Sequence, residues 1–287
     1  SLAFLFLGLV PISAMGQSLP NTFTANTAAK ASEVNANFEY LLERFKLRAT
    51  TIDCSNGSIQ DALKEYNHIK LSGNCNQYVQ IGLRGYQSSS QQQINRDFIF
   101  IEGLDPNKAT TISSSNLVVV DIDDTVTVHL KNLTISGTNQ YALAVGRGAT
   151  LYAESLEVKN AQNGITVNDG GIAYLSDITV SATSNAVQVT RNGTARIYNN
   201  SLLQNSPVGL AVYYGSHAQV DNSTIKGNQL GVYMKQASLD VYGSTISNNT
   251  EDGFLLHHNS SAEINNSNIL SNTNDGLTLR NGSQALV

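Results

Sequence analysis

Residues 209–230 read GLAVYYGSHAQVDNSTIKGNQL and residues 231–252 read GVYMKQASLDVYGSTISNNTED, so apolar, glycine and asparagine positions return after 22 residues. An apolar ladder with this period has seven members between about residue 125 and residue 283, at spacings of 21 to 24 residues. Its members are Leu133, Leu156, Ile178, Leu202, Ile225, Ile246 and Ile269. A period of this length indicates a stack of short structural repeats.

Two further apolar ladders accompany the first one. The second lies about nine residues later and consists of Leu143, Ile165, Val187, Leu210, Val232, Phe254 and Leu277, each with another apolar residue two positions on. The third, which is weaker, consists of Leu151, Ala173, Ile197, Val220, Val241 and Ile264. Three short strands per coil of about 22 residues predict an all-β fold, the right-handed parallel β-helix. Leucine-rich, propeller and helical repeats need other spacings.

Small and polar residues recur beside these ladders. A glycine or alanine precedes every member of the second ladder, which we interpret as a tight bend at the start of a strand. These residues are Ala142, Gly164, Ala186, Gly209, Gly231, Gly253 and Gly276. Asn205, Asn228, Asn249 and Asn272 each lie three positions after the first ladder. We expect their amides to stack and to hydrogen-bond from coil to coil.

The chain before the regular coils is divided into several segments. Residues 50–124 are expected to form an N-terminal cap and irregular first coils, and residues 125–287 the regular coils, which stop in mid-coil. A helix from Ile59 to about Tyr66, with capping-box chemistry at Ser58, is expected to cover the open end of the stack. The Ser/Gln run Gln87–Gln93 is interpreted as a loop between early coils.

The first 49 residues differ in composition from the coils. The apolar run from Leu2 to Val10, with Ala14 and Gly16 after it, predicts that residues 1–16 are a signal peptide whose basic start is missing. A membrane anchor is the alternative, but the run is shorter than the roughly 20 apolar residues that span a bilayer. Residues 17–49 are interpreted as a linker followed by an amphipathic helix, with apolar residues at helical spacing from Val34 to Phe45.

Cysteine content and charge limit the compartment and the partners. Cys54 and Cys75 are the two cysteines, and an even number in an exported chain favours one disulfide, with two free thiols as the alternative. We therefore expect a secreted, periplasmic or cell-surface protein. The net charge of −5 provides no basic field for nucleic acid, and we expect no membrane insertion once the signal peptide is removed.

Several segments near the start of the coils resemble a known family. Thr51-Ile-Asp-Cys54, Ser58-Ile-Gln-Asp-Ala-Leu63, Gly73-Asn-Cys75 and the strand before Gly103 are similar to the opening of pectin-lyase-like β-helix proteins. The resemblance covers roughly residues 50–287 and implies a secreted bacterial β-helix protein. It does not assign an activity, because this family includes polysaccharide lyases, glycoside hydrolases, epimerases, adhesins and proteins without known chemistry.

No complete catalytic set is identified, so the catalytic residues are unknown. Polygalacturonases carry an Asn-Thr-Asp segment, a paired Asp, Gly-His-Gly and Arg-x-Lys, whereas this chain has Asn272-Thr-Asn-Asp275 and none of the other three. The nearest candidate is an acidic pair, Asp252 and Asp275, one coil apart. Asp121, Asp123 and Asp124 suit a weak Ca²⁺ site or a solvated turn; we favour the turn and expect no metal and no cofactor.

A column of aromatic and basic residues follows the second ladder and forms the main candidate site. Its members are Tyr213, Tyr214, Tyr233, Lys235, His257, His258 and Arg280. Aromatic rings provide flat apolar platforms, and Lys, Arg and His donate to hydroxyls or carboxylates, so this column fits a saccharide. The alternative is that any repeat scaffold aligns ordinary surface residues in columns.

Two functions remain open at this point. The first is a secreted protein that binds, or also processes, an extracellular polysaccharide or cell-surface glycan. The second is a structural or adhesive surface protein without catalytic activity. The regular coils, the missing catalytic set and the helix before the coils favour the second, whereas the column and the predicted export favour the first.

Overall fold

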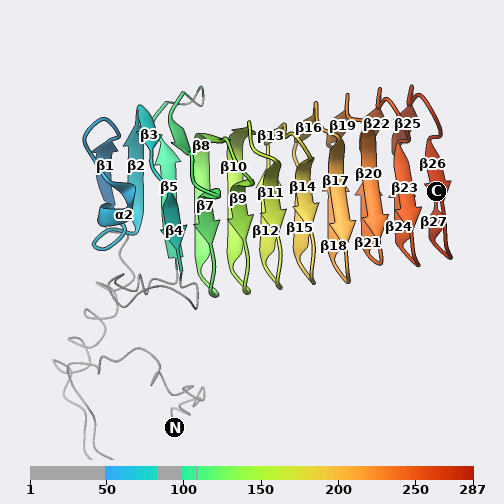
Figure 1. Ribbon diagram of the computed structural model, residues 1–287, viewed down its shortest axis with the longest axis horizontal. Helices are drawn as coiled ribbons and strands as arrows, with labels where there is room; N and C mark the ends of the chain where they lie inside the picture. The colour runs from blue at the N-terminus through green and yellow to red at the C-terminus, as the bar shows by residue number, and fades with distance from the viewer. Residues whose placement is uncertain (1–48, 83–97, 106, 108) are drawn as a thin grey trace, which may run out of the picture. The chain divides into compact units, whose positions relative to one another are not determined.

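The structure is a computed structural model that describes residues 49–82, 98–105, 107 and 109–287. Within these residues the chain forms a parallel β-solenoid with three strand positions per coil. Figure 1 shows the strands stacked in chain order from β1 to β27. Partner residues in neighbouring coils from β8 onward are 21 to 23 residues apart, as in the pairs Val220 with Val241 and Thr194 with His217.

Strands of the first and second positions belong to one 18-stranded sheet, here sheet A, because β8 and β10 run through both positions. The first position holds β1 (Ala49–Asp53), β2 (His68–Ser72), β5 (Phe98–Gly103), β8 (Thr127–Gly137), β10 (Thr150–Lys159), β12 (Ile172–Ser176), β15 (Thr194–Tyr198), β18 (His217–Asp221), β21 (Ser238–Tyr242), β24 (Ser261–Asn265) and β27 (Gln284–Leu286). The second holds β3 (Asn74–Asn76), β6 (Thr111–Ser114), β13 (Thr179–Val180), β16 (Leu202–Gln204), β19 (Thr224–Lys226), β22 (Thr245–Ser247) and β25 (Asn268–Leu270).

Strands of the third position form a separate nine-stranded sheet, here sheet B. They are β4 (Val79–Ile81), β7 (Val118–Ile122), β9 (Tyr141–Val145), β11 (Asn163–Val167), β14 (Asn185–Val189), β17 (Val208–Tyr213), β20 (Leu230–Lys235), β23 (Phe254–His257) and β26 (Leu277–Leu279). The second ladder lies in this sheet in the predicted register, since Leu210 pairs with Val232 and Val232 with Phe254. These side chains fill one continuous core.

The first ladder was predicted out of register in part of its length, by two residues up to Ile178 and by one residue at Leu202. Ile225 pairs with Leu203, which is fully buried, whereas the predicted member Leu202 pairs with Thr179 and Thr224 and is half-buried. The true inward column is Ile112, Ile135, Val158, Val180, Leu203, Ile225, Ile246 and Ile269. Leu133, Leu156 and Ile178 are also buried and lie two residues before the members of this column, on the same inward face. The prediction joined two columns because adjacent apolar residues stand at 202 and 203.

The third ladder also joined two inward columns. Ala173 pairs with Ala195, and Ile197 pairs with Leu175, so the predicted step from Ala173 to Ile197 crosses two residues. Both columns point inward because side chains two residues apart lie on the same face of a strand. The alternation between inside and outside was therefore correct, and the register was wrong.

Buried asparagines stack at the bend between the second and third strand positions. The Asn249 side-chain oxygen accepts from the Asn228 backbone N–H at 3.0 Å, and Asn272 repeats this contact with Asn249 at 3.1 Å. The column continues into the preceding coil as Ser206, whose backbone N–H donates to Asn228. Asn205 is outside the column, contrary to the prediction, because it is exposed and takes the left-handed backbone conformation at φ 54°.

The glycines before the second ladder allow neighbouring coils to pack closely. They were predicted to form tight bends, and this prediction was wrong. None of these glycines has a positive φ. A Cβ on Gly231 would stand 2.5 Å from the Gly253 carbonyl oxygen and 2.8 Å from the side-chain nitrogen of Asn249. The absence of a side chain at 231 thus leaves room for the asparagine stack.

The described N-terminal part contains one short helix and the disulfide. Helix α2 (Ile59–Ala62) is shorter than predicted, and the Ser58 hydroxyl accepts from the Asp61 backbone N–H as the capping box requires. Ile59 and Leu63 are fully buried in the common core. Cys54, which follows β1, forms a disulfide with Cys75 in β3, as predicted.

Several predictions fall on residues that the structure does not describe. These are the signal peptide at 1–16, nearly all of the linker and helix at 17–49, and the Gln87–Gln93 loop. Among the residues that are described, no helix has the length and apolar character needed to cross a membrane.

Candidate functional site

The predicted aromatic and basic column assembles on the outer face and edge of sheet B, and we call it the sheet B stripe. Strand register aligns Tyr213, Lys235 and His257 in successive coils, because Tyr213 pairs with Lys235 and Lys235 with His257. Tyr233 lies two residues before Lys235 on the same outward face of β20. The stripe comprises Tyr213, Tyr214, Tyr233, Lys235, His257, His258 and Arg280.

The rings of the stripe contact one another across three coils. The ring centroids of Tyr213 and Tyr233 are 5.6 Å apart, and those of Tyr233 and His257 are 5.9 Å apart. The Lys235 Nζ lies 5.5 Å from the centre of the Tyr214 ring, in cation–π distance. Tyr214 is 49% exposed and thus offers much of its ring to a ligand.

The corner after sheet B turns through the left-handed backbone region in successive coils. Tyr214, Gln236 and His258 have φ values of 50°, 53° and 55°. His258 therefore does not continue the strand, and its ring centroid is 5.5 Å from that of His257. In earlier coils this corner carries Asp169 and Arg191, which form an ion pair at 2.8 Å.

The stripe carries several basic side chains although the chain as a whole is acidic. Burial lowers the pKa of His257, and the positive charges of Arg280, His258 and Lys235 lower it further. Burial and the neighbouring Tyr233 and Tyr214 raise the pKa of Tyr213 to about 12. At neutral pH the stripe thus presents hydroxyl groups and cationic donors beside its rings.

The candidate acidic pair is placed away from the stripe. Asp252 is buried, and its carboxylate accepts from the Asp275 backbone N–H at 3.2 Å, so it holds the next coil in place. Asp252 and His257 are five residues apart along strand β23 and the residue before it, a separation of about 16 Å in an extended chain. The structure therefore does not join the acidic pair and the stripe into one site.

The candidate cation cluster consists of residues that contact protein groups. Asp121 accepts from the Tyr78 hydroxyl at 3.2 Å, and Asp124 lies 3.7 Å from the Arg147 guanidinium. Nowhere in the described ranges do three or more His, Cys, Asp or Glu side chains gather as metal ligands would.

An aromatic column on the outer face of sheet A, which we call the sheet A column, was not predicted from the sequence. Register places five rings in line over successive coils: His68, Phe100, His129, Tyr152 and Tyr174. The signal is present in the sequence, but a longer first interval, from 68 to 100, hides its period. It becomes visible only when β2 and β5 are known to be partners.

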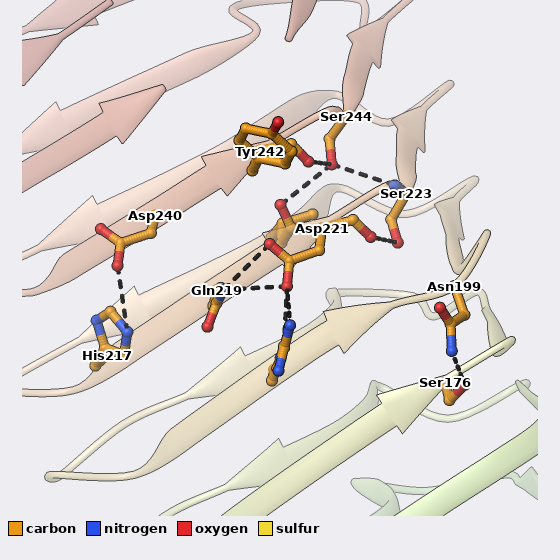
Figure 2. A network of polar contacts seen from close by, with 11 residues as sticks. Ser176, Asn199, His217, Gln219, Asp221, Ser223, Asp240, Tyr242 and Ser244 are labelled. Atoms are coloured by element: carbon orange, nitrogen blue, oxygen red, sulfur yellow. Dashed lines mark hydrogen bonds and ion pairs between the residues drawn. The ribbon is translucent and has the colours of Figure 1, made fainter. Parts of the chain in front are cut away.

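The same column turns polar in the later coils. Arg196 follows Tyr174 in register, then Gln219 and Asp240. Figure 2 shows this polar part, in which Gln219 donates to Asp221 and His217 lies 3.8 Å from Asp240. The Arg196 guanidinium contacts the Asp221 carboxylate at 2.8 Å.

His129 within the sheet A column predicts a fall in stability on mild acidification. Burial lowers the pKa of His129 in the folded protein, with Glu154 and Lys131 acting in opposite directions. The unfolded chain therefore binds more protons than the folded protein once the pH falls toward the ordinary histidine pKa of about 6.5. We expect the urea midpoint to decrease between about pH 8 and pH 5, and to decrease less in His129→Phe.

Phe100→Leu is the matched control for this measurement, because it alters packing in the same column without removing a titrating group. Its midpoint should be lower than that of the parent by the same amount at both pH values. A His129→Phe variant with the full pH dependence of the parent contradicts the assignment to His129.

Comparison with known families agrees with this geometry. The family model described as right-handed β-helix region matches residues 117–269, which is more than half of the chain. The chain belongs to the right-handed β-helix family. A search of curated proteins gives no match to this right-handed β-helix. The predicted fold class is therefore confirmed, and membership of the family assigns architecture without assigning a ligand or a reaction.

Proposed function

We propose that this right-handed β-helix protein binds an extracellular polysaccharide or cell-surface glycan through the sheet B stripe. One observation supports the proposal above the others: rings and cationic groups from three coils pack into a single exposed cluster. An exposed aromatic cluster on a soluble fold is uncommon unless it serves binding.

The chemistry of the stripe suits sugars. The exposed ring of Tyr214 offers a face to the apolar side of a pyranose, while Lys235 and Arg280 offer donors to its hydroxyls or to a carboxylate. Neighbouring coils are about 4.8 Å apart, so a linear chain lying along the stack meets a new set of side chains in every coil. A repeating ligand is thus matched by a repeating surface.

Export from the cell is part of the proposal. The Cys54–Cys75 disulfide is compatible with an oxidising compartment, and the apolar run at 2–10 supports a signal peptide. We place the protein outside the cytoplasm, in a bacterial source, either secreted, in the periplasm or at the cell surface.

We propose binding without catalysis as the first function. Hydrolysis or elimination at the stripe would need carboxylates beside the bound sugar, and the contacts of Asp252 are to the backbone of the next coil. The structural or adhesive alternative is supported by a different observation, the unbroken hydrogen-bonded stack of buried asparagines.

A glycan array probed with the intact 287-residue chain tests the proposal. Tyr214→Ala and His257→Ala should each weaken binding by about fivefold, since each removes one ring contact worth about 1 kcal/mol. Tyr242→Ala is the matched control, because Tyr242 is equally exposed, at 52%, and lies on sheet A outside the stripe. Equal glycan binding by Tyr214→Ala, His257→Ala and the parent removes the stripe as the binding surface and favours the structural function.

A further inference from the structure

The five rings of the sheet A column form a continuous surface line on a different sheet from the stripe. His68 and Phe100 have ring centroids 4.7 Å apart, Phe100 and His129 5.0 Å, and His129 and Tyr152 5.8 Å. Tyr152 and Tyr174 stack with centroids 4.8 Å apart and an angle of 9° between their planes. Tyr152 is 39% exposed, and Phe98, two residues before Phe100 on β5, is 40% exposed.

The fold does not require rings at this position. Arg196, Gln219 and Asp240 occupy the same column in later coils, and those coils stack in the same parallel register. The later coils thus act as an internal comparison, in which the column is polar and the solenoid continues unchanged. The rings occupy five consecutive positions of the column, between Ala49 in the first coil and Arg196, which indicates a local surface property.

The charges beside the rings cancel. The neighbouring outward column carries Lys70, Glu102, Lys131 and Glu154 in alternation. The Lys131 ammonium contacts the Glu154 carboxylate at 2.8 Å, and Glu102 contacts His68 at 2.8 Å and Lys70 at 3.7 Å. This surface has no excess of either sign, unlike the positive stripe on sheet B. It therefore provides no electrostatic attraction for a charged ligand.

The shape of the column favours a thin ligand. It is one residue wide, and adjacent outward side chains on a strand are about 7 Å apart. Over five coils this gives a footprint of roughly 170 Å², from the strand spacing and the rise per residue. A stable protein interface covers about 800 Å² on each partner, so a second folded chain would find too little surface here.

We infer that the sheet A column is a second binding site, which takes a neutral linear polysaccharide lying along the stack of coils. The sugar rings contact the edges and exposed faces of the aromatic side chains, one coil after another. Threonine hydroxyls on one side, at Thr127 and Thr150, and the ion pairs on the other donate to and accept from the sugar hydroxyls. The inference is independent of the stripe, because the two surfaces belong to different sheets.

Affinity electrophoresis of the intact chain in gels that contain hydroxyethylcellulose, glucomannan or polygalacturonate tests the inference. We expect retardation by at least one of the two neutral polymers. The double variant Tyr152→Ala/Tyr174→Ala should lose about tenfold or more in affinity for it. Tyr152→Phe/Tyr174→Phe keeps the rings and should retain most of the binding.

Two controls separate this site from the stripe. Tyr242→Ala, at an exposed ring of sheet A outside both surfaces, should leave retardation by the neutral polymer unchanged. The loss caused by Tyr152→Ala/Tyr174→Ala should also appear in a chain that already carries Tyr214→Ala/His257→Ala, so the two proposals succeed or fail separately. Circular dichroism and the urea midpoint of the alanine double variant show whether its coils remain folded. If that variant unfolds, Tyr152→Ser alone, at the most exposed ring of the column, takes its place and should weaken binding severalfold.

Three outcomes overturn the inference. The first is that neither neutral polymer retards the parent chain. The second is that folded Tyr152→Ala/Tyr174→Ala is retarded as strongly as the parent, or that only polygalacturonate binding responds to it. The third is that analytical ultracentrifugation finds a dimer that this double variant dissociates, which assigns the column to a second copy of the chain.

Discussion

Asn249→Ala is expected to lower the free energy of unfolding by about 3 kcal/mol, since it leaves buried hydrogen-bonding groups without partners. Asn249 is fully buried, and its side chain accepts from the Asn228 backbone N–H and donates to the Asn272 side-chain oxygen at 2.8 Å. Alanine cannot replace either contact, and Asn228 is itself buried, so its N–H loses its hydrogen-bond acceptor away from solvent. Urea denaturation followed by circular dichroism measures the change.

The adjacent Asn248 is the control for this substitution. Asn248 is exposed and has a φ of 54°, a conformation that glycine adopts without strain. Asn248→Gly should therefore change the free energy of unfolding by less than about 0.5 kcal/mol. We interpret the buried asparagine stack, and not asparagine at the bend in general, as the feature that holds neighbouring coils together. Equal losses of unfolding free energy in Asn249→Ala and Asn248→Gly would contradict this interpretation.

Phe254→Ala is expected to cost about 3 to 5 kcal/mol through the cavity that it leaves. Phe254 is fully buried in β23 and is the largest buried side chain of the described core. Phe254 lies between Val232 and Leu277, its partners in the two neighbouring coils. The side chains of these coils cannot fill the cavity unless their strands shift. The same urea experiment applies, with the near-UV spectrum as a second measurement of packing.

Phe254→Leu is the matched variant for the cavity. Leu143 and Leu210 occupy the same column in earlier coils, so leucine fits the position and should cost about 1 kcal/mol. A Phe254→Ala loss as small as that of Phe254→Leu contradicts tight packing in this part of the core.

The fold could be predicted from the sequence because apolar residues recur at a regular interval in the third strand of each coil. The second ladder was in correct register at every member, and the stripe was found for the same reason, since it follows that ladder directly. Sheet A was predicted less well. Its coils differ by one or two residues in length, and the apolar neighbours Leu202 and Leu203 leave the choice of inward residue open until the strand partners are known.

The burial and contacts of the candidate site side chains could not be predicted from the sequence either. Asp252 and Asp275 were predicted as a candidate acidic pair, whereas the structure shows Asp252 buried and bonded to backbone. The sheet A column was missed because outward positions carry no periodic apolar signal in most coils. Identifying it needs the pairing of His68 with Phe100, which lies across the long interval of the second coil.

The pairing of each coil with only its two neighbours also determines how the protein responds to tension. When the chain is pulled from its ends, the outermost coil bears the load alone, because parallel strands peel apart one hydrogen-bonded rung at a time. Each coil that detaches releases about 22 residues, or roughly 75 Å of extended chain. Extension therefore proceeds in nearly equal steps. The coils that have not yet detached stay folded and resist the force one after another.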